Sequence, residues 1–463
     1  MRNILHLAGA LSLLTGAVNG LQVDFTADSS IKEAASTIAF GLLKYYTGNN
    51  TGDVPGNLPA PYFWWEAGAM FGTLIDYWFY TGDDTYNDLT LQGMVHQAGD
   101  DQDFMPINQT RTEGNDDQGF WGMAAMSAAE NDFPNPPSDQ PQWLALAQAV
   151  FNEYVTRWDP ANCGGGLRWQ IFTFNNGFNY KNSIANGCFF NIASRLARFT
   201  GNQTYADWAE KVFDWMQEIK FMDEQYNIFD GAGTDQNCSI ISPAQWTYNA
   251  GIYLHGAAVM YNFTNGSSVW QTRTQGLMQR AVDHFFEDGV VVEQACEPFS
   301  NCDNDQQSFK GYLLRWFTGT ATLAPFTFNT LMPLVRSSAA AAVASCTGSP
   351  PAGEFNGPAG TACGFKWANN TGFDGVVGVG EQMSALSATQ YSLVQEQTFA
   401  ETKAPVTSTT GGTSKGNPNA GINNATDAFE LPPVTLGERV AAGFATSAIV
   451  LSVIGGSVFV MKS

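Results

Sequence analysis

Two consecutive aspartates are the strongest candidates for chemistry in this sequence. Asp116 and Asp117 lie between Gly114 and Trp121, at the start of a segment that predicts a helix. Side chains of neighbouring residues in the first turn of a helix lie about 100° apart around its axis, so both carboxyl groups can face one cavity. Two carboxyls about 5–5.5 Å apart are typical of a retaining glycosidase. A second interpretation is that the pair only caps the helix and complements its dipole.

A mixture of aromatic, amide and charged side chains recurs in several other segments. Aromatic faces cover the apolar C–H patches of sugars, and amide groups form hydrogen bonds with sugar hydroxyls. This mixture of side chains is therefore typical of binding sites for neutral sugars. Of Trp64 and Trp65, only the one that faces the cavity can be a sugar platform. The residues expected to bind substrate are Trp64, Trp65, Asn115, Trp121, Tyr180, Lys181, Asn182, Asp230, Tyr248, Asn249, Gln307 and Lys310.

Charge and motif spacing argue against other chemistries. The 463 residues carry a net charge of −22 with only 21 Lys and Arg, whereas a nucleic-acid ligand requires a basic surface. His96, His255 and His284 are scattered and show no spacing typical of a metal site. Gly164–Gly166 lacks the flanking strand and the Lys-Ser/Thr pair of a phosphate loop. We therefore expect no metal, no cofactor and no nucleic acid, and we expect a carbohydrate substrate.

Two kinds of helical segment alternate along the chain. Segments such as 204–219 are amphipathic, whereas segments such as 246–262 are rich in small and aromatic residues on all sides. A helix with one polar face belongs on the outside of a domain, and a helix that is apolar all round belongs inside. Six outer and inner pairs predict an all-α fold, the (α/α)6 barrel: 29–46 with 64–80, 86–98 with 117–130, 142–157 with 183–199, 204–219 with 246–262, 268–286 with 306–319, and 326–345 with 378–396.

In such a barrel, the loops that lead into the inner helices converge at one end. The Asp116–Asp117 pair lies at the start of an inner helix, so we expect the candidate site residues to gather at this mouth. An internal sequence repeat supports the predicted alternation of inner and outer helices. The segment 80–88 is repeated in outline at 199–207, and each copy places a Gly or Asn turn between an inner and an outer helix.

Both ends of the chain have the composition of targeting signals. Residues 1–20 combine a basic start, an apolar run and small residues, as a signal peptide does. Residues 425–463 combine a polar spacer with an apolar tail, as in a GPI-attachment signal. Asn424 is the preferred attachment residue, with Asn423 or Gly421 as alternatives. A permanent transmembrane helix is the other interpretation of the tail, although the tail has almost no basic flank.

Between these ends we expect one glycosidase domain and a short linker. The domain spans 21–400, and residues 401–424, rich in Ser, Thr and Gly, predict a flexible stalk. The sequence contains sequons for N-glycosylation, which agree with a secretory route. The expected glycosylated residues are Asn49, Asn108, Asn202, Asn237, Asn262, Asn265 and Asn369.

Seven cysteines indicate an oxidising compartment. Short spacings favour two local disulfides, and Cys188, in an apolar helical run, is our choice for a buried free thiol. The remaining two cysteines are then left to pair. The expected disulfides are Cys296–Cys302, Cys346–Cys363 and Cys163–Cys238.

The set of motifs resembles glycoside hydrolase family 76, the endo-α-1,6-mannanases. The similar elements are the Asp-Asp pair with its Gly-Phe-Trp sequel, the Tyr180–Asn182 stretch with Asn186, the Thr-Tyr-Asn-x-Gly element at 247–251 and the Phe-Lys-Gly element at 309–311. The signal peptide, stalk and tail are similar to the fungal GPI-anchored branch of that family. The resemblance covers nearly all of residues 24–397.

This resemblance implies a retaining mechanism, with Asp116 as nucleophile and Asp117 as acid and base. We expect Asp116 to titrate low and Asp117 to hold its proton. The fungal branch implies a cell-wall enzyme on the outer leaflet of the cell membrane. Its donor would be an α-1,6-mannose glycan or the GPI core glycan, and β-glucan would be the acceptor. A plain endo-α-1,6-mannan hydrolase and a non-catalytic mannan-binding protein remain alternatives.

Overall fold

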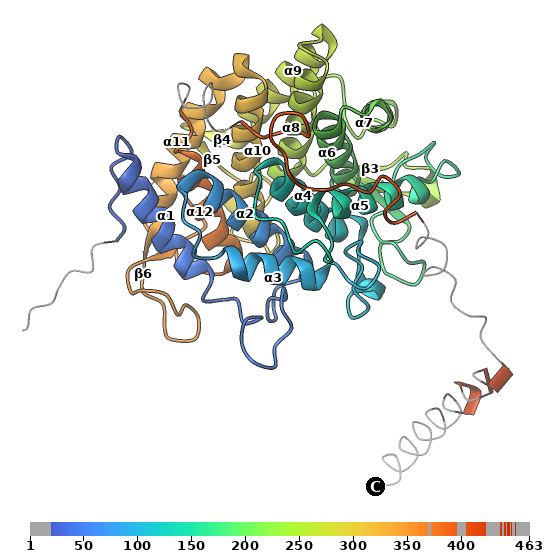
Figure 1. The fold of residues 1–463 in the computed structure, drawn as a ribbon, viewed down its shortest axis with the longest axis horizontal. Coiled ribbons are helices and arrows are strands. Elements are labelled where there is room, and N and C mark those ends of the chain that lie inside the picture. The colour runs from blue at the N-terminus through green and yellow to red at the C-terminus, as the bar shows by residue number, and fades with distance from the viewer. Residues whose placement is uncertain are drawn as a thin grey trace, which may run out of the picture. The chain divides into compact units, whose positions relative to one another are not determined.

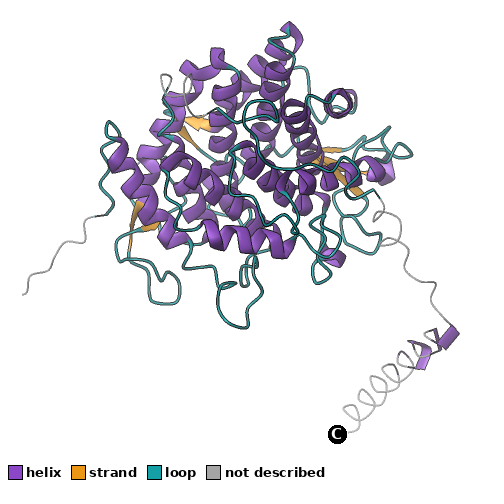
Figure 2. Ribbon diagram, in the orientation of Figure 1, coloured by secondary structure: helices purple, strands orange, loops and turns teal. Residues whose placement is uncertain are grey.

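Twelve α-helices dominate the regular secondary structure in the part of the chain that the structure describes. The computed structural model describes residues 20–368, 372–395 and 404–422, with a few residues between 436 and 450. Contacts divide the chain into two units, Met1–Gly421 and Ile422–Ser463. All named helices and strands belong to the first unit, and Figures 1 and 2 show them.

Six helices form an inner ring. Each packs on the next one in chain order, and the last packs on the first, so the ring is closed. Side chains on all sides of these helices are buried, which confirms the prediction from their apolar composition. The inner helices are α2 (Trp64–Thr81), α4 (Asn115–Glu130), α6 (Ser183–Thr200), α8 (Thr247–Phe263), α10 (Phe309–Leu323) and α12 (Val379–Tyr391).

Six further helices surround this ring, and each packs on an inner neighbour. All twelve helices coincide with the predicted segments to within a few residues, so the predicted (α/α)6 barrel is confirmed. The outer helices are α1 (Asp28–Leu42), α3 (Asn87–Gln97), α5 (Trp143–Arg157), α7 (Gln203–Glu218), α9 (Ser268–Phe285) and α11 (Phe328–Ser345).

Small residues let the inner helices approach closely. A Cβ atom on Gly68 of α2 would lie 2.9 Å from the Trp121 ring of α4. A Cβ on Gly251 of α8 would lie 2.7 Å from Trp316 of α10. Such contacts are shorter than van der Waals packing permits, so a side chain at either glycine would push the helices apart.

Short strands and 3-10 turns lie in the loops. One antiparallel sheet has the order β1-β2-β3, with Tyr180 opposite Gly233 and Gly231 opposite Ser242. Two two-stranded ribbons occur further along the chain. The strands are β1 (Tyr180–Asn182), β2 (Gly231–Gly233), β3 (Ile241–Ser242), β4 (Phe286–Glu287), β5 (Val290–Val291), β6 (Cys346–Gly348) and β7 (Ala362–Cys363); the 3-10 turns are η1 (Thr110–Thr112), η2 (Thr234–Gln236), η3 (Glu297–Phe299), η4 (Gln306–Ser308) and η5 (Pro325–Thr327).

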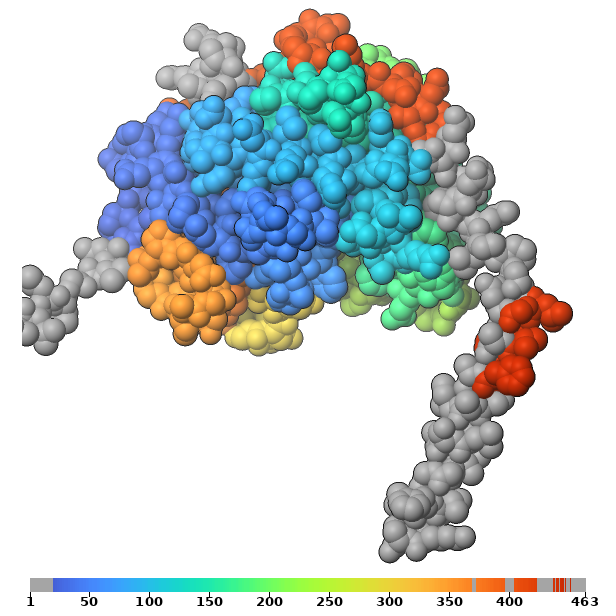
Figure 3. Space-filling model, turned by 60° about the horizontal axis from the view of Figure 1, so that its bottom comes forward, coloured from blue at the N-terminus to red at the C-terminus, as the bar shows by residue number. Residues whose placement is uncertain are grey.

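The outer helix α5 differs from its neighbour α7. Charged residues of α7, such as Asp207 and Lys211, are exposed, as an outer helix requires. In α5 only Thr156 is exposed, because residues 404–421 cover its outer face. We call this segment the C-terminal strap. The red strap crosses the front of Figure 1 near α4 and α5, and at the top of Figure 3 it lies directly on the teal surface.

Hydrogen bonds hold the strap along its length. The backbone N–H of Val406 donates to Glu130 O at 2.7 Å, and that of Asn417 donates to Gln148 Oε1 at 2.6 Å. Asn152 Nδ2 donates to the carbonyl oxygens of Pro418 and Ala420, at 2.9 and 2.7 Å. Backbone groups of a flexible linker would be solvated instead, so this part of the expected stalk is in fact packed.

Glycines explain why the strap fits so closely. A Cβ on Gly416 would lie 2.7 Å from Gln148 Oε1, and one on Gly421 would lie 2.8 Å from Ala149 O. Gly421 also has a φ of 75°, which favours glycine. The composition that predicted flexibility therefore serves close packing against α5.

The disulfides of the structure are Cys163–Cys238, Cys296–Cys302 and Cys346–Cys363, and Cys188 is the buried free thiol. All four assignments agree with the sequence analysis. Six of the expected glycosylated asparagines are described, and each is exposed: Asn49, Asn108, Asn202, Asn237, Asn262 and Asn265.

Other sequence predictions fall outside the described residues. These are the signal peptide before residue 20, the sequon at Asn369 and the attachment residue Asn424. Among the residues that the structure does describe, no helix has the length and hydropathy of a membrane span.

Candidate active site

A cavity of about 200 Å³ opens where the inner helices begin. We call this end of the barrel the mouth and the opposite end the closed end. The walls of the cavity combine aromatic rings with four carboxyl groups, and none of the described residues that line the cavity is a Lys or an Arg. The lining residues are Trp65, Asp116, Asp117, Phe120, Trp169, Tyr180, Asn182, Ile184, Asp230, Tyr248, Asp305 and Phe309.

Asp116 and Asp117 lie in the first turn of α4 and share one wall of this cavity. The carboxyl of Asp117 accepts the backbone N–H of Gly114 at 2.6 Å, so it also caps the helix. Asp116 Oδ1 accepts the N–H of Asp117 at 3.1 Å, and Oδ2 accepts Asn182 Nδ2 at 3.3 Å. The capping interpretation and the catalytic one are therefore compatible, because the capping oxygen belongs to a side chain that lines the cavity.

Gly114 leaves room for both carboxyl groups. A Cβ on this residue would lie 2.3 Å from Asp116 Oδ1 and 3.3 Å from Asp117 Oδ2. The separation of these two oxygens cannot exceed the sum of those distances, about 5.6 Å. The backbone of Gly114 is extended (φ −89°), so it is space rather than conformation that requires glycine here.

Removal from water governs the protonation of the pair. Burial raises the pKa of Asp116 to about 7, although the hydrogen bond from Asn182 opposes the rise. Burial and then the neighbouring Asp116 raise the pKa of Asp117 well above its ordinary value. The expectation that Asp116 titrates low is wrong, because the helix N–H groups compensate only part of the lost hydration.

A second part of the cavity lining is built around Asp230. Its Oδ2 accepts the Tyr180 hydroxyl at 2.6 Å and its Oδ1 accepts Trp246 Nε1 at 3.1 Å. Tyr248 and Phe309 stack face to face, with ring centroids 3.7 Å apart and planes 8° apart. These bonds fix aromatic surfaces of the kind that pack on sugar rings.

Asp305 is a lining carboxylate that the sequence analysis missed. Burial raises its pKa to about 6, and its Oδ1 is buried without a hydrogen-bond partner among the described residues. The analysis chose Gln307 in the same segment, but Gln307 Nε2 donates to Cys302 O at 3.2 Å. The other lining residues not predicted to bind substrate are Phe120, Trp169, Ile184 and Phe309.

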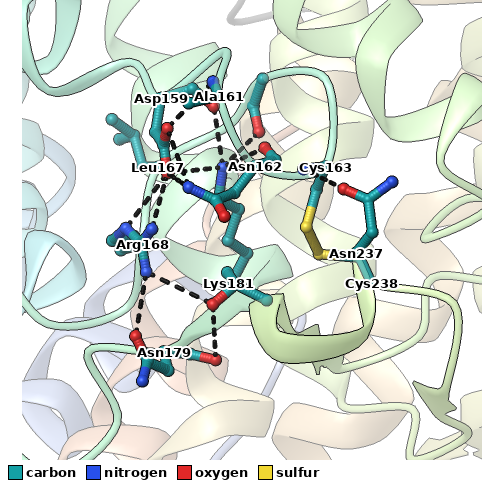
Figure 4. Close-up of polar contacts among 12 residues, drawn as sticks. Asp159, Ala161, Asn162, Cys163, Leu167, Arg168, Asn179, Lys181, Asn237 and Cys238 are labelled. Carbon is teal, nitrogen blue, oxygen red and sulfur yellow. Dashed lines mark hydrogen bonds and ion pairs between the residues drawn. A yellow bond between two sulfur atoms is a disulfide. The ribbon is translucent and has the colours of Figure 1, made fainter.

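Lys181 does not line the cavity, contrary to expectation. Its side chain is fully buried, and Nζ donates to the carbonyl oxygens of Asp159, Asn162 and Gly165 at 3.0, 2.8 and 2.6 Å. Figure 4 shows the ammonium enclosed by this loop, next to the disulfide at Cys163. Lys181 therefore shapes a loop behind the site.

Lys310 has a similar structural position. Its ammonium pairs with Glu297 at 3.1 Å, donates to the carbonyl of Phe365 and lies 4.1 Å from the centre of the Trp367 ring. The buried carboxylate and the aromatic faces compensate the charge of the lysine inside the protein.

Several other residues that were expected to bind substrate lie behind the cavity wall. Trp65 lines the cavity, whereas Trp64 donates to Gln97 Oε1 at 2.8 Å and stacks on Trp121, with ring centroids 5.0 Å apart. Asn115 Nδ2 donates to Arg168 O at 2.9 Å. The expected residues that do not line the cavity are Trp64, Asn115, Trp121, Lys181, Asn249, Gln307 and Lys310.

With this geometry in view, the chain can be compared with known proteins. The sequence pattern described as glycosyl hydrolase family 76 matches residues 30–408. The chain belongs to glycosyl hydrolase family 76. It is therefore a glycoside hydrolase, and the cavity at the barrel mouth is its candidate active site.

Related proteins match most of the length of this chain. The mannan endo-1,6-α-mannosidase DCW1 of Saccharomyces cerevisiae is 46% identical and the match covers 98% of both chains. The crystal structure of Dfg5 from Chaetomium thermophilum, in complex with glucosamine, is 45% identical, has a TM-score of 0.81 and is matched over 87% of this chain and 97% of that one. The GH76A α-1,6-mannanase of a Salegentibacter species, 20% identical with a TM-score of 0.60 over 78% of this chain and 98% of its own, shares the fold.

Proposed function

We propose that this family 76 enzyme is a retaining endo-α-1,6-mannosidase with Asp116 as nucleophile and Asp117 as general acid and base. The observation that carries the proposal is the placement of both carboxyls on one cavity wall, with oxygens no more than about 5.6 Å apart. Retaining glycosidases hold the pair about 5–5.5 Å apart, whereas inverting enzymes leave about 6.5–9.5 Å for a water molecule.

The surroundings support this division of roles. Asn182 Nδ2 and the N–H of Asp117 both donate to Asp116, and such bonds favour the ionised carboxylate that a nucleophile needs. Once Asp116 is ionised, its charge raises the pKa of Asp117, so the acid keeps its proton.

The reaction then proceeds in two balanced steps. In the first, an Asp116 oxygen bonds to the anomeric carbon of a mannose while the bond to the glycosidic oxygen breaks, and Asp117 protonates that leaving oxygen. In the second, Asp117 removes a proton from an acceptor hydroxyl, whose oxygen bonds to the anomeric carbon and releases Asp116.

We further propose that the donor is an α-mannoside of a GPI glycan and that β-glucan is the acceptor. The names of the fungal relatives support an α-1,6-mannoside as donor. Glucosamine bound to the Chaetomium Dfg5 supports a glycan that contains an amino sugar. Carboxyls and aromatic rings line the cavity, with no Lys or Arg among its described lining residues, and this lining suits a neutral or cationic sugar.

Mixing the ectodomain with an α-1,6-mannose donor and β-glucan oligomers tests transfer directly. We expect joined products, detected by mass, that increase with acceptor concentration. Free mannan products alone at every acceptor level would contradict transfer and leave the plain hydrolase. Asp116→Asn is the control, and it should form neither product. If that variant kept the cell-wall function of the host as well as sugar binding, a non-catalytic mannan-binding role would replace the enzyme.

The proposed location is the outer leaflet of the cell membrane, with a GPI anchor at Asn424. The sequence pattern at both ends of the chain supports it. A phospholipase specific for GPI should release the protein from cell membranes. Retention of the protein after such treatment would favour a transmembrane tail.

A further inference from the structure

Two buried amide side chains flank the catalytic pair along the chain. Asn115 precedes Asp116 and Gln118 follows Asp117, and we call residues 115–118 the catalytic turn. Neither amide lines the cavity. At about 100° per helical residue, the two amides lie about 60° apart on one face of α4, and both aspartates point away from that face. The amides therefore attach the catalytic turn to the protein behind the cavity wall.

Arg157 of the outer helix α5 bonds to both amides. Its Nη1 donates to Asn115 Oδ1 at 3.1 Å and to Gln118 Oε1 at 2.6 Å. Its Nη2 pairs with Glu153, one turn earlier in α5. A guanidinium group is planar and holds its donors in a rigid fork, so these bonds fix the position of the catalytic turn relative to α5.

Further hydrogen bonds restrain each amide. Gln118 Nε2 donates to Glu153 Oε2 at 2.7 Å and to the carbonyl oxygen of Asp103 at 2.8 Å. The hydroxyl of Tyr154, also on α5, donates to the backbone carbonyl of Asn115. A movement of the catalytic turn would break several of these buried bonds, and leaving buried polar groups without partners costs free energy.

The first turn of a helix needs such support more than its middle does. The first N–H groups of a helix have no acceptor within the helix, and helix ends fray. Reacting groups must be held accurately, because a displacement of about 1 Å can lower a rate about 100-fold. The bonds to α5 therefore have a direct consequence for carboxyl groups that react from this turn.

We propose that Arg157 is a positioning residue for the glycosidase reaction. It holds the catalytic turn so that Asp116 reaches the anomeric carbon and Asp117 reaches the glycosidic oxygen. This inference rests on the proposed roles of the two aspartates. Since Arg157 does not line the cavity, it acts on the rate of bond cleavage and not on the affinity for substrate.

The first test removes the fork together with its carboxylate partner. In the double variant Arg157→Met with Glu153→Leu, neither member of the ion pair is left buried without the other. Its kcat on an α-1,6-mannan fragment, per folded molecule, should fall about 10- to 100-fold, while KM changes less than about threefold. Denaturant unfolding gives the folded fraction. The matched control is Arg195→Met with Glu130→Leu, which removes a buried pair at the closed end and should leave kcat unchanged.

The variant Arg157→Lys separates charge from geometry. Lysine keeps a positive charge opposite Glu153, but its compact ammonium group cannot reproduce the fork that joins Asn115 and Gln118. We expect this variant to fold and still to lose at least about fivefold in kcat. Parent-like kcat in the lysine variant, or in the folded double variant, would overturn the positioning role. A rise in KM with unchanged kcat would overturn it as well.

The variants Asp116→Asn and Asp117→Asn, measured in the same assay, test the proposed function separately. If both lose activity on the mannan fragment while the Arg157 variants keep their kcat, only the positioning role is wrong. If both aspartate variants keep full activity, the catalytic roles are wrong and the positioning role is wrong with them.

Discussion

Carboxyl groups at the two ends of the barrel have opposite surroundings. At the closed end, Glu130 pairs with Arg195 and Asp76 with Arg315, each at 2.7 Å. Tyr391 also donates to Asp76 at 2.7 Å. At the mouth, the cavity lining that the structure describes contains no arginine or lysine, and burial raises the pKa of the lining carboxyls.

This difference distinguishes carboxyl groups that stabilise the fold from carboxyl groups that are suited to catalysis. A buried carboxyl group that is paired with an arginine and further donors is held in place, and removing its partner costs stability. A buried carboxyl without a cation keeps a pKa near or above neutrality, which suits proton transfer and nucleophilic attack. Glu113, three residues before Asp116, also has a pKa well above its ordinary value, because burial and the charge of Asp117 raise it more than the charge of Arg157 lowers it.

The largest effect on stability is expected at the closed end. Arg195→Met leaves Glu130 buried without its cation, which should cost about 3–5 kcal/mol in the free energy of unfolding. Denaturant unfolding checks this value. The double variant Arg195→Met with Glu130→Leu should recover much of the loss, because no uncompensated charge remains. A single variant as stable as the parent would remove the distinction between the two ends.

At the mouth, Asn182→Ala should reduce activity without a comparable loss of stability. The variant removes the Asn182 donor to Asp116. A hydrogen bond to a charged group contributes about 1.5–3 kcal/mol, or roughly a 10- to 100-fold change in kcat/KM. The rise of kcat/KM with pH should also move above pH 7, because the ionised form of Asp116 loses support. Hydrolysis of an α-1,6-mannan fragment across pH is the measurement, and an unchanged profile would argue against Asp116 as the titrating group.

Asp116→Asn should stabilise the protein at alkaline pH. The folded state holds a proton on Asp116 up to about pH 7, whereas the unfolded state releases it near 3.8, so this group makes stability fall as pH rises between those values. A tenfold change in a protonation constant corresponds to about 1.4 kcal/mol, and we expect a gain on the order of 2 kcal/mol at pH 8 and almost none at pH 4. Unfolding at both pH values, compared with the parent, checks the sign.

The smallest effect is expected from Asp305→Asn. The charge of Asp305 raises the pKa of both Asp116 and Asp117. Without it, the ascending limb of the kcat/KM profile should move below pH 7 by less than about one unit, as a partly screened neighbour allows. Asp303→Asn, an exposed carboxylate two residues earlier, is the control and should move the limb less. A shift to higher pH would contradict the assignment.

The barrel could be predicted from the sequence because inner and outer helices have different residue patterns. An inner helix is apolar on all sides, whereas an outer helix has one apolar face and one polar face. The strap could not, because its Gly, Ser and Thr content is also that of a flexible linker. A signal was nevertheless present in the helix that it covers. The first ten residues of α5, Trp143 to Asn152, contain no charge, whereas α7 has several charged residues. An outer helix without a charged face indicates that another segment covers it.

Within the site, the alternation of side chains along strand β1 determines which of residues 180–182 line the cavity. Side chains alternate across a strand, so Tyr180 and Asn182 face the cavity and Lys181 faces away. A three-residue strand leaves no periodicity in the sequence, and all three residues were predicted to bind substrate. Asp305 was missed for a related reason, since the turn η4 directs that residue to the cavity and Gln307 to the loop at Cys302.

Trapping of a glycosyl-enzyme with α-mannosyl fluoride tests the catalytic pair most directly. Fluoride leaves without protonation, so Asp117→Asn should still form the covalent adduct, visible by mass on the peptide that contains Asp116, while it loses activity on α-1,6-mannan. Asp116→Asn should form no adduct with either donor. An adduct with Asp116→Asn, or none with Asp117→Asn, would contradict the assigned roles. Full activity of both variants would place the catalytic pair elsewhere and leave only the helix cap.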